Sequence, residues 1–136
     1  MRFSLSLLFV LLFQSCLSAD LKIIKDIPYK ATTSDAYEKE RCKLDIYLTD
    51  AKEKTPVFVW FHGGGMTSNS KEKENEVGAI ARKFAANGVA FIAINYRLNP
   101  KVKYPAYIDD AAASVKWTID IADKYGFDKK KIFIGG

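Results

Sequence analysis

Residues 56–73 read PVFVWFHGGGMTSNSKEK, which places three consecutive glycines directly after a run of large apolar residues. The run at 57–62 is almost continuously apolar, and so is VAFIAINY at 89–96. Such runs are typical of parallel strands that helices cover on both faces. Between them, apolar residues recur at helical spacing before Gly88, a predicted C-terminal cap: Val77, Ile80, Ala81, Phe84 and Ala85. The stretch therefore predicts a unit of two parallel strands joined by a helix.

The segments before this unit predict two more strands. Residues 21–29 (LKIIKDIPY) and 42–48 (CKLDIYL) are rich in strand formers, and the second alternates apolar and polar side chains. We expect them to be antiparallel edge strands. Together with the parallel strands they predict an α/β fold, a doubly wound and mostly parallel sheet with antiparallel N-terminal strands and right-handed crossovers.

The segments after the unit continue the alternation. A helix is predicted from about Pro105 to Lys124, with Gly126 beyond its end. Its expected apolar stripe consists of Ile108, Ala112, Val115, Ile119 and Ala122. A short apolar strand at 132–134 then leads into two glycines at 135–136.

Length and composition allow one globular domain. The chain has 136 residues, 49% of them apolar, which is enough for one core. The net charge of +5 comes from dispersed lysines without a basic patch, so we expect a solvated surface and no nucleic-acid partner. Cys42 is predicted to be a structural strand cysteine. With one histidine and no second mature cysteine, we expect no metal site and no cofactor.

The N-terminus has the pattern of a secretory signal. Arg2 precedes the apolar stretch 5–13, and small polar residues follow, which predicts a signal peptide at 1–19 and a mature domain at 20–136. The apolar stretch rises only about 14 Å as a helix, too short for a permanent membrane span. The expected location is secreted or periplasmic. The alternative is a lipid anchor through Cys16, although the residues before it are a poor lipobox.

Three readings compete for the glycines. A plain turn needs fewer of them, because each costs roughly 0.5–1 kcal/mol of conformational entropy. Dinucleotide binding requires G-x-G-x-x-G, but Ser68 stands at the last position, and the next strand ends without an acidic residue. Arg97 would suit only an NADP-type variant. An oxyanion hole is the third reading: backbone N–H groups at Gly63 and Gly64 stabilise a negative oxygen, and side chains there would crowd an acyl group.

Four motifs together resemble the α/β-hydrolase esterase/lipase family. They are FHGGG (61–65), INYRL (94–98), YPAYIDDAAASVKW (104–117) and KIFIGG (131–136). Their order is similar to the N-terminal half of secreted feruloyl and acetyl-xylan esterases. The resemblance implies a partial α/β-hydrolase fold, carboxylic ester hydrolysis, and a small-molecule or carbohydrate ester as substrate.

The same resemblance assigns roles to residues. Gly63 and Gly64 would form the oxyanion hole, and His62 and Gly65 would support it. Arg97 and Asp110 are expected to form a supporting ion pair, against the alternative of a surface arginine and a solvated aspartate.

Three further side chains are expected to shape the site. Met66 stands where many relatives have an aromatic residue. Tyr96 and Tyr104 either line the pocket mouth or pack their rings inside and hydrogen-bond their hydroxyls.

The family's nucleophile elbow, G-x-S-x-G, would start at Gly136, and no serine follows in this sequence. His62 is the only histidine, so no Ser-His-Asp triad can be assembled from these residues. We expect the chain as written to be inactive and to fold poorly alone, whether it is a fragment, an incomplete gene model or a true truncation. The alternative functions are a non-catalytic binding module and, less favoured, a nucleotide-binding oxidoreductase.

Overall fold

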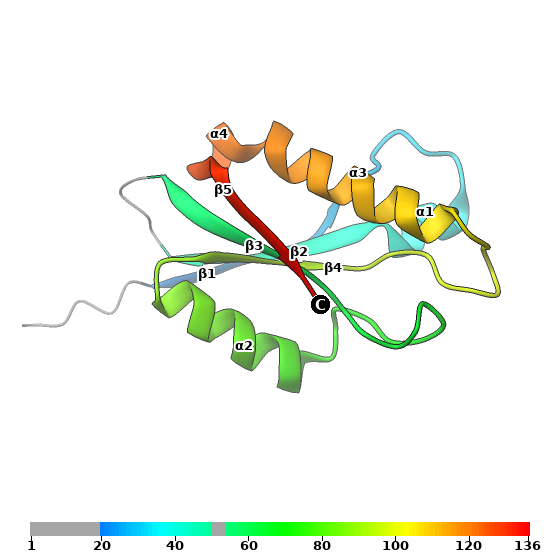
Figure 1. The fold of residues 1–136 in the computed structure, drawn as a ribbon, viewed down its shortest axis with the longest axis horizontal. Coiled ribbons are helices and arrows are strands. Elements are labelled where there is room, and N and C mark those ends of the chain that lie inside the picture. Colours follow the sequence, from blue (N-terminus) through cyan, green and yellow to red (C-terminus); the bar gives the residue numbers. More distant parts are fainter. Residues whose placement is uncertain (1–19, 50–53) are drawn as a thin grey trace, which may run out of the picture.

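The computed structural model describes residues 20–49 and 54–136, which form a five-stranded sheet with helices on both faces (Figure 1). The strands are β1 (Leu21–Pro28), β2 (Lys43–Thr49), β3 (Thr55–Phe61), β4 (Ala90–Ile94) and β5 (Phe127–Gly135). The helices are α1 (Ala36–Arg41), α2 (Glu74–Ala86), α3 (Ala106–Asp120) and α4 (Ala122–Tyr125). The predicted signal peptide, and Cys16 with it, lies outside the described residues. No helix within the described ranges is long and apolar enough to cross a membrane.

The strand order is β1-β2-β4-β3-β5, and the predicted doubly wound α/β architecture is confirmed. Strands β3, β4 and β5 are mutually parallel, and β2 runs antiparallel to both of its neighbours. The prediction that 42–48 is an edge strand was wrong, because β2 lies between β1 and β4. Its alternation was misleading: Asp45, the polar residue in the pattern, is 3% exposed and is neutralised by an ion pair with Lys71.

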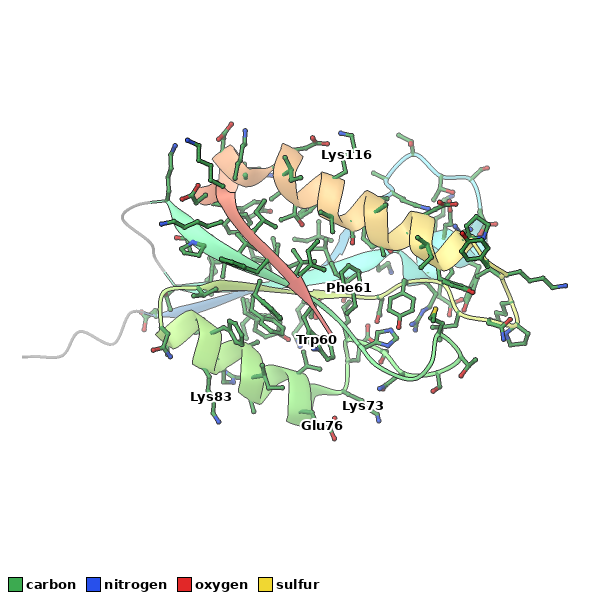
Figure 2. All side chains as sticks on the ribbon, in the orientation of Figure 1. Trp60, Phe61, Lys73, Glu76, Lys83 and Lys116 are labelled. Atoms are coloured by element: carbon green, nitrogen blue, oxygen red, sulfur yellow. The ribbon has the colours of Figure 1, made fainter. Side chains whose placement is uncertain are left out.

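The core has one layer on each side of the sheet. Figure 1 shows α2 below the sheet and α3 with α4 above it. Strand β4 is buried throughout, as its continuous apolar run predicts. Adjacent residues of β3 alternate between the layers (Figure 2): Trp60 packs on the α2 side and Phe61 on the α3 side. The ends of β3 and β4 are therefore held between two packed helical layers.

The predicted helix at 105–124 is in fact two helices, α3 and α4. Its predicted apolar stripe was right at Val115 and Ala122, which pack in the core, and wrong at the three exposed positions Ile108, Ala112 and Ile119. The face that α3 buries carries Asp110, Ser114 and Thr118, all 0% exposed, whereas Ile108 and Ile119 are 50% and 42% exposed. Small polar side chains can face the sheet here because their hydroxyls bond within the helix: Ser114 donates to a carbonyl one turn earlier, and Thr118 donates to the Ser114 carbonyl.

One element was absent from the sequence prediction, and another is longer than predicted. Helix α1 was not predicted, although Asp35 caps it by accepting a hydrogen bond from the Glu38 N–H at 2.8 Å. Strand β5 starts at Phe127, earlier than the predicted 132–134, because Phe127 pairs with Thr55 and is itself buried. The intervening lysines are exposed, which hid this part of the strand from an apolar pattern.

Candidate active site

The glycine loop lies at the carboxyl end of β3. Gly64 has φ 115° and Gly65 has φ 59°, both in the region that favours glycine. A Cβ on Gly64 would also overlap the carbonyl oxygen of Ser68, whereas a Cβ on Gly63 would meet nothing within 4 Å. The loop therefore needs glycine at 64 for its own conformation, and Gly63 faces open space.

The polar groups of this loop are used unequally. The carbonyl of Gly64 accepts from the Thr67 N–H at 3.1 Å and from the Thr67 hydroxyl at 3.0 Å. The carbonyl of Gly63 contacts His62 Nδ1 at 2.8 Å. In contrast, the N–H groups of Gly63 and Gly64 donate to no acceptor among the described residues, and both glycines are exposed. Two backbone donors are thus available to an external acceptor.

His62, directly before the glycines, is buried (2% exposed). Its ring stacks on Tyr96 with centroids 4.4 Å apart, and the Tyr96 hydroxyl donates to the His62 carbonyl at 2.7 Å. Burial lowers the pKa of His62, and the positive charge of Arg41 adds to this effect. The predicted structural histidine is therefore a neutral ring locked between the ends of β3 and β4.

Arg41, the last residue of α1, belongs to this site and was missed by the sequence analysis. Its Nε donates to the Tyr96 carbonyl at 3.0 Å, and its terminal nitrogen contacts both His62 Nε2 (3.3 Å) and the Asn69 carbonyl (3.1 Å). The Arg41 guanidinium thus connects both sides of the glycine loop, at His62 and Asn69, to Tyr96 just after β4. The capping residue Asp35 was the sequence signal for this helix.

The far end of the loop is fixed by Lys71, which is 2% exposed. Its ammonium lies 2.8 Å from both Asp26 and Asp45 and 3.0 Å from Glu72. Its backbone N–H donates to the side chain of Asn95, which follows β4, at 2.7 Å. Burial alone would raise the pKa of Glu72, but hydrogen bonds from neighbouring side chains lower it to about 2. The sequence analysis missed this anchor as well.

The predicted ion pair between Arg97 and Asp110 is present and bidentate, at 2.9 and 2.8 Å, and the Arg97 N–H adds a third bond at 3.0 Å. Asp110 is 0% exposed, so the alternative of a solvated aspartate was wrong. Lys30 and Glu38 join the pair to make a network of four charges. Arg97 directly follows Tyr96, so the pair holds the N-terminal part of α3 against the strand end.

Strand β5 delivers its terminal glycines next to the loop. Gly135 pairs with Trp60 in parallel register, and a Cβ there would lie 2.6 Å from the Phe58 ring. A Cβ on Gly136 would overlap the carbonyl oxygen of Phe61. The end of β5 therefore approaches the residue before His62 so closely that only glycine fits.

A cavity of about 170 Å³ opens beside the glycine loop. It is lined by Phe61, Met66, Tyr96, Tyr107, Ile108 and Ala111. Tyr96 packs and hydrogen-bonds as predicted. Tyr104 does not, because its side chain is 74% exposed. Its ring contacts the Tyr107 ring edge-on, with the ring centroids 6.4 Å apart. The lining is almost wholly apolar, so the cavity suits an uncharged group.

Two other chemistries find little support in the described residues. Helix α2 begins only at Glu74, so the glycine loop does not open directly into a helix as a dinucleotide site requires. Within residues 20–49 and 54–136, no three His, Cys, Asp or Glu side chains are grouped to hold a metal ion. Cys42 is buried, which raises the pKa of its thiol to about 11 and makes it unreactive.

Residues 44–136 match the BD-FAE family. The match covers more than half of the chain. The chain belongs to the BD-FAE family. Carboxylesterase NlhH of Mycobacterium tuberculosis (strain CDC 1551 / Oshkosh) is 34% identical to this BD-FAE chain over 86 residues, 62% of the chain and 26% of NlhH. The chain thus spans about a quarter of the length of this relative. Its relatives place it among the α/β-hydrolase esterases, a family of ester hydrolases.

Solved structures resemble this BD-FAE chain in fold. Esterase B from Lactobacillus rhamnosis (HN001) superposes with a TM-score of 0.71 at 23% identity, covering 87% of the chain and 36% of esterase B. A truncated form of a carbohydrate esterase from gut microbiota superposes with a TM-score of 0.66 at 25% identity, covering 87% of this chain and 40% of the esterase chain. The partial α/β-hydrolase fold expected from the motifs is confirmed.

Proposed function

We propose that this chain provides the oxyanion-binding half of a serine carboxylic ester hydrolase. The observation that carries the proposal is the pair of N–H donors at Gly63 and Gly64, exposed at the carboxyl end of β3 without acceptors among the described residues. When a nucleophile adds to an ester, the carbonyl oxygen becomes negative, and fixed N–H dipoles stabilise it without reorganising. Each such donor contributes about 3–4 kcal/mol of transition-state stabilisation.

The end of β5 is the proposed entry to the nucleophile. In G-x-S-x-G the serine stands two residues after the first glycine, on a sharp strand-to-helix turn. With Gly136 packed against Phe61, a serine at that distance would emerge beside the glycine loop. His62 is not the general base, because both ring nitrogens already have partners in Gly63 and Arg41. The base and its acid would come from the polypeptide beyond Gly136.

The cavity beside the loop supports a compact substrate. Its volume of about 170 Å³ is close to the ~150 Å³ apolar cavity that holds benzene. A short acyl chain or one ring therefore fits. We propose a small-molecule or carbohydrate ester as the substrate, the latter supported by the carbohydrate esterase among the similar structures.

The first test is to sequence the coding DNA downstream of the Gly136 codon. The proposal expects an in-frame x-Ser-x-Gly, then an Asp and a His further along. The complete polypeptide should then hydrolyse p-nitrophenyl acetate, and changing the elbow serine to alanine should abolish this activity. A stop codon directly after Gly136, or an active serine-to-alanine variant, would overturn the proposal. In the first case the non-catalytic binding module becomes the better explanation.

A further inference from the structure

Arg41 contacts three separate parts of the site from a single guanidinium. It reaches the Tyr96 carbonyl after β4, the Asn69 carbonyl on the far side of the glycine loop, and the ring of His62 before the glycines. An arginine that only stabilised α1 would need none of these partners. The contact with His62 has a consequence for the chemistry of the loop.

The donors and acceptors around His62 permit only one neutral tautomer. A guanidinium carries N–H donors and no acceptor, so His62 Nε2, 3.3 Å from Arg41, must present its lone pair. The ring proton then sits on Nδ1, which donates to the Gly63 carbonyl at 2.8 Å. In the other tautomer, Nε2–H would face the guanidinium and the Nδ1 lone pair would face a carbonyl oxygen. Both contacts therefore select the Nδ1–H form.

This hydrogen bond also fixes the orientation of the peptide that joins Gly63 to Gly64. The peptide is trans and planar, so the Gly63 carbonyl and the Gly64 N–H point in opposite directions. Because the carbonyl is held by the His62 ring, the Gly64 N–H is turned away from that ring. Without the bond, the Gly63 carbonyl would lose this restraint, and Gly63 itself is conformationally permissive.

We propose that Arg41 is a positioning residue: it holds His62 as the Nδ1–H tautomer, which fixes the Gly63 carbonyl and thereby aims the Gly64 N–H. The inference rests on the proposed function, because this aim matters for catalysis only if the Gly64 N–H binds an oxyanion. It adds a residue on α1, outside the glycine motif, to the machinery of that site.

The groups that face His62 agree with a neutral ring. Burial lowers its pKa, and so does the Arg41 charge, while the hydrogen bond to Gly63 and the charge of Glu72 act in the opposite direction. Tyr96, stacked on the ring, stays uncharged because burial raises its own pKa. A protonated ring would place Nε2–H against the guanidinium, so protonation of His62 would break the contact with Arg41.

The direct test is the tautomer of His62, read from the ¹⁵N shifts of its ring in the complete polypeptide. In the 136-residue chain His62 is the only histidine; in a longer chain, a His62→Asn variant identifies its signals. We expect a protonated Nδ1 and an unprotonated Nε2 near neutral pH. A wild-type ring in the Nε2–H form, or in a mixture of both forms, would overturn the inference without any Arg41 variant.

Variants then separate positioning from mere stability. Arg41→Met should let the Nε2–H form appear, whereas Arg41→Lys, which keeps a cationic donor, should retain part of the Nδ1–H form. Arg82→Met, at an exposed site on α2, is the matched control and should leave the ring unchanged. An Arg41→Met protein that stays folded with an unchanged tautomer would contradict the inference.

Activity gives the second readout. In the complete enzyme, Arg41→Met should lower kcat on the order of 10-fold to 100-fold, less than the ~10²–10³-fold for a deleted oxyanion donor, with KM nearly unchanged. If the complete enzyme is an active esterase and Arg41→Met leaves its kcat unchanged, this inference is wrong and the proposed function is unaffected. An inactive polypeptide with the locked tautomer would overturn the proposed function and keep the structural link from Arg41 to Gly63.

Discussion

Gly63 and Gly64 are adjacent, but they lack side chains for different reasons. At Gly64 the backbone itself excludes a Cβ, both by its φ of 115° and by the nearby Ser68 carbonyl. At Gly63 the backbone imposes no such limit, since a Cβ there would meet nothing within 4 Å. The absence of a side chain at Gly63 therefore points to the space in front of the loop, where a ligand would lie.

Alanine substitutions should separate these reasons. Gly64→Ala forces a strained conformation and should cost about 1–3 kcal/mol of folding free energy, seen as a lower Tm. Gly63→Ala should change the folding free energy by less than about 0.5 kcal/mol. In the complete enzyme, Gly63→Ala should nevertheless lower kcat, because its methyl group intrudes on the acyl group. Equal losses of stability in the two variants would contradict this assignment.

Met66 should control the size of the acyl group. It lines the cavity of about 170 Å³ and is 42% exposed, so a larger side chain can be placed there without unfolding the core. In the complete enzyme, Met66→Trp should raise the ratio of kcat/KM for acetyl over butyryl esters about 10-fold, since each methylene is worth ~1–3 kcal/mol in an apolar pocket. Met66→Leu, similar in volume, is the control. An unchanged ratio in the tryptophan variant would place the acyl group elsewhere.

Residues were predictable from the sequence when their chemistry was local. The glycine loop is a contiguous motif after an apolar strand, so it was visible in the sequence. Arg41 was not, because its partners lie 21, 28 and 55 positions away and an arginine near a helix end is otherwise common. Lys71 was hidden for the same reason, since the carboxylates of Asp26 and Asp45 come from two distant strands.

At the scale of elements, α3 is attached to the sheet by a buried charge as well as by apolar packing of Ala113, Val115 and Trp117. Asp110, near the N-terminal end of α3, binds Arg97 after β4 and Lys30 after β1, and Arg97 also binds Glu38 of α1. Asp110→Asn removes the buried carboxylate from this network and leaves Glu38 as the partner of the half-buried Lys30 and Arg97. Losing the charged acceptor should cost about 1–3 kcal/mol in denaturant unfolding. Asp120→Asn, at an exposed ion pair of the same helix, is the control and should cost less than about 1 kcal/mol.

The same aspartate makes the stability depend on pH. Burial alone would raise the pKa of Asp110, but hydrogen bonds from Arg97 and Lys30 outweigh it and hold the pKa below its usual value. A depressed folded-state pKa stabilises the fold above the unfolded pKa of about 3.9, and the contribution is lost as the pH falls from there through the folded pKa. The unfolding free energy should therefore drop over this acid range, and more weakly in Asp110→Asn. Parallel curves for the two proteins would exclude Asp110 as the cause.

Elements were predicted well where one physical signal dominated. The continuous apolar runs identified β3 and β4 because both faces of these strands are covered. The edge assignment of β2 failed because a buried ion pair let Asp45 enter the core. The stripe of α3 was only partly right because Ser114 and Thr118 satisfy their hydroxyls within the helix and can replace apolar residues at the sheet. In both cases polar groups were buried with partners that a hydropathy pattern does not reveal.

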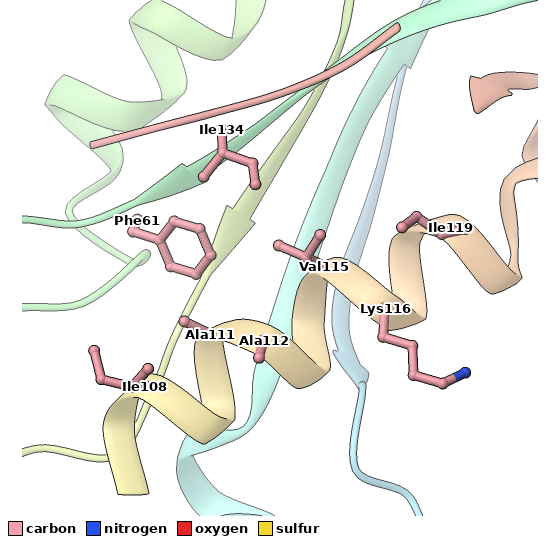
Figure 3. Close-up of a pocket in the computed structure, with 8 residues that line it drawn as sticks. All are labelled: Phe61, Ile108, Ala111, Ala112, Val115, Lys116, Ile119 and Ile134. Atoms are coloured by element: carbon pink, nitrogen blue, oxygen red, sulfur yellow. The ribbon is translucent and has the colours of Figure 1, made fainter. Parts of the chain in front are cut away.

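At the scale of the molecule, the edge of the sheet formed by β5 is exposed. Within the described residues β5 pairs with β3 alone, and its apolar side chains Phe133 and Ile134 are 57% and 60% exposed. Between β5 and the exposed stripe of α3 lies an apolar groove of about 500 Å³ (Figure 3), in which Ile134 and Phe61 face Val115. An exposed apolar strand of this kind promotes association with other chains. This exposed edge is the physical reason to expect that the 136-residue chain folds poorly alone.

Ile134→Lys tests this expectation, because the substitution should be favourable in the 136-residue chain and destabilising in a complete hydrolase. In the 136-residue chain the side chain is largely exposed, so a lysine there should reduce self-association, measured by sedimentation, with little loss of secondary structure. In a complete hydrolase, further chain should cover this face and bury the lysine without a counter-charge, which should lower Tm. Ile92→Lys, at a position 0% exposed, should unfold both forms. If Ile134→Lys destabilised the short chain as severely as Ile92→Lys, the groove would already be part of a closed core, and the fold would need no further polypeptide to complete it.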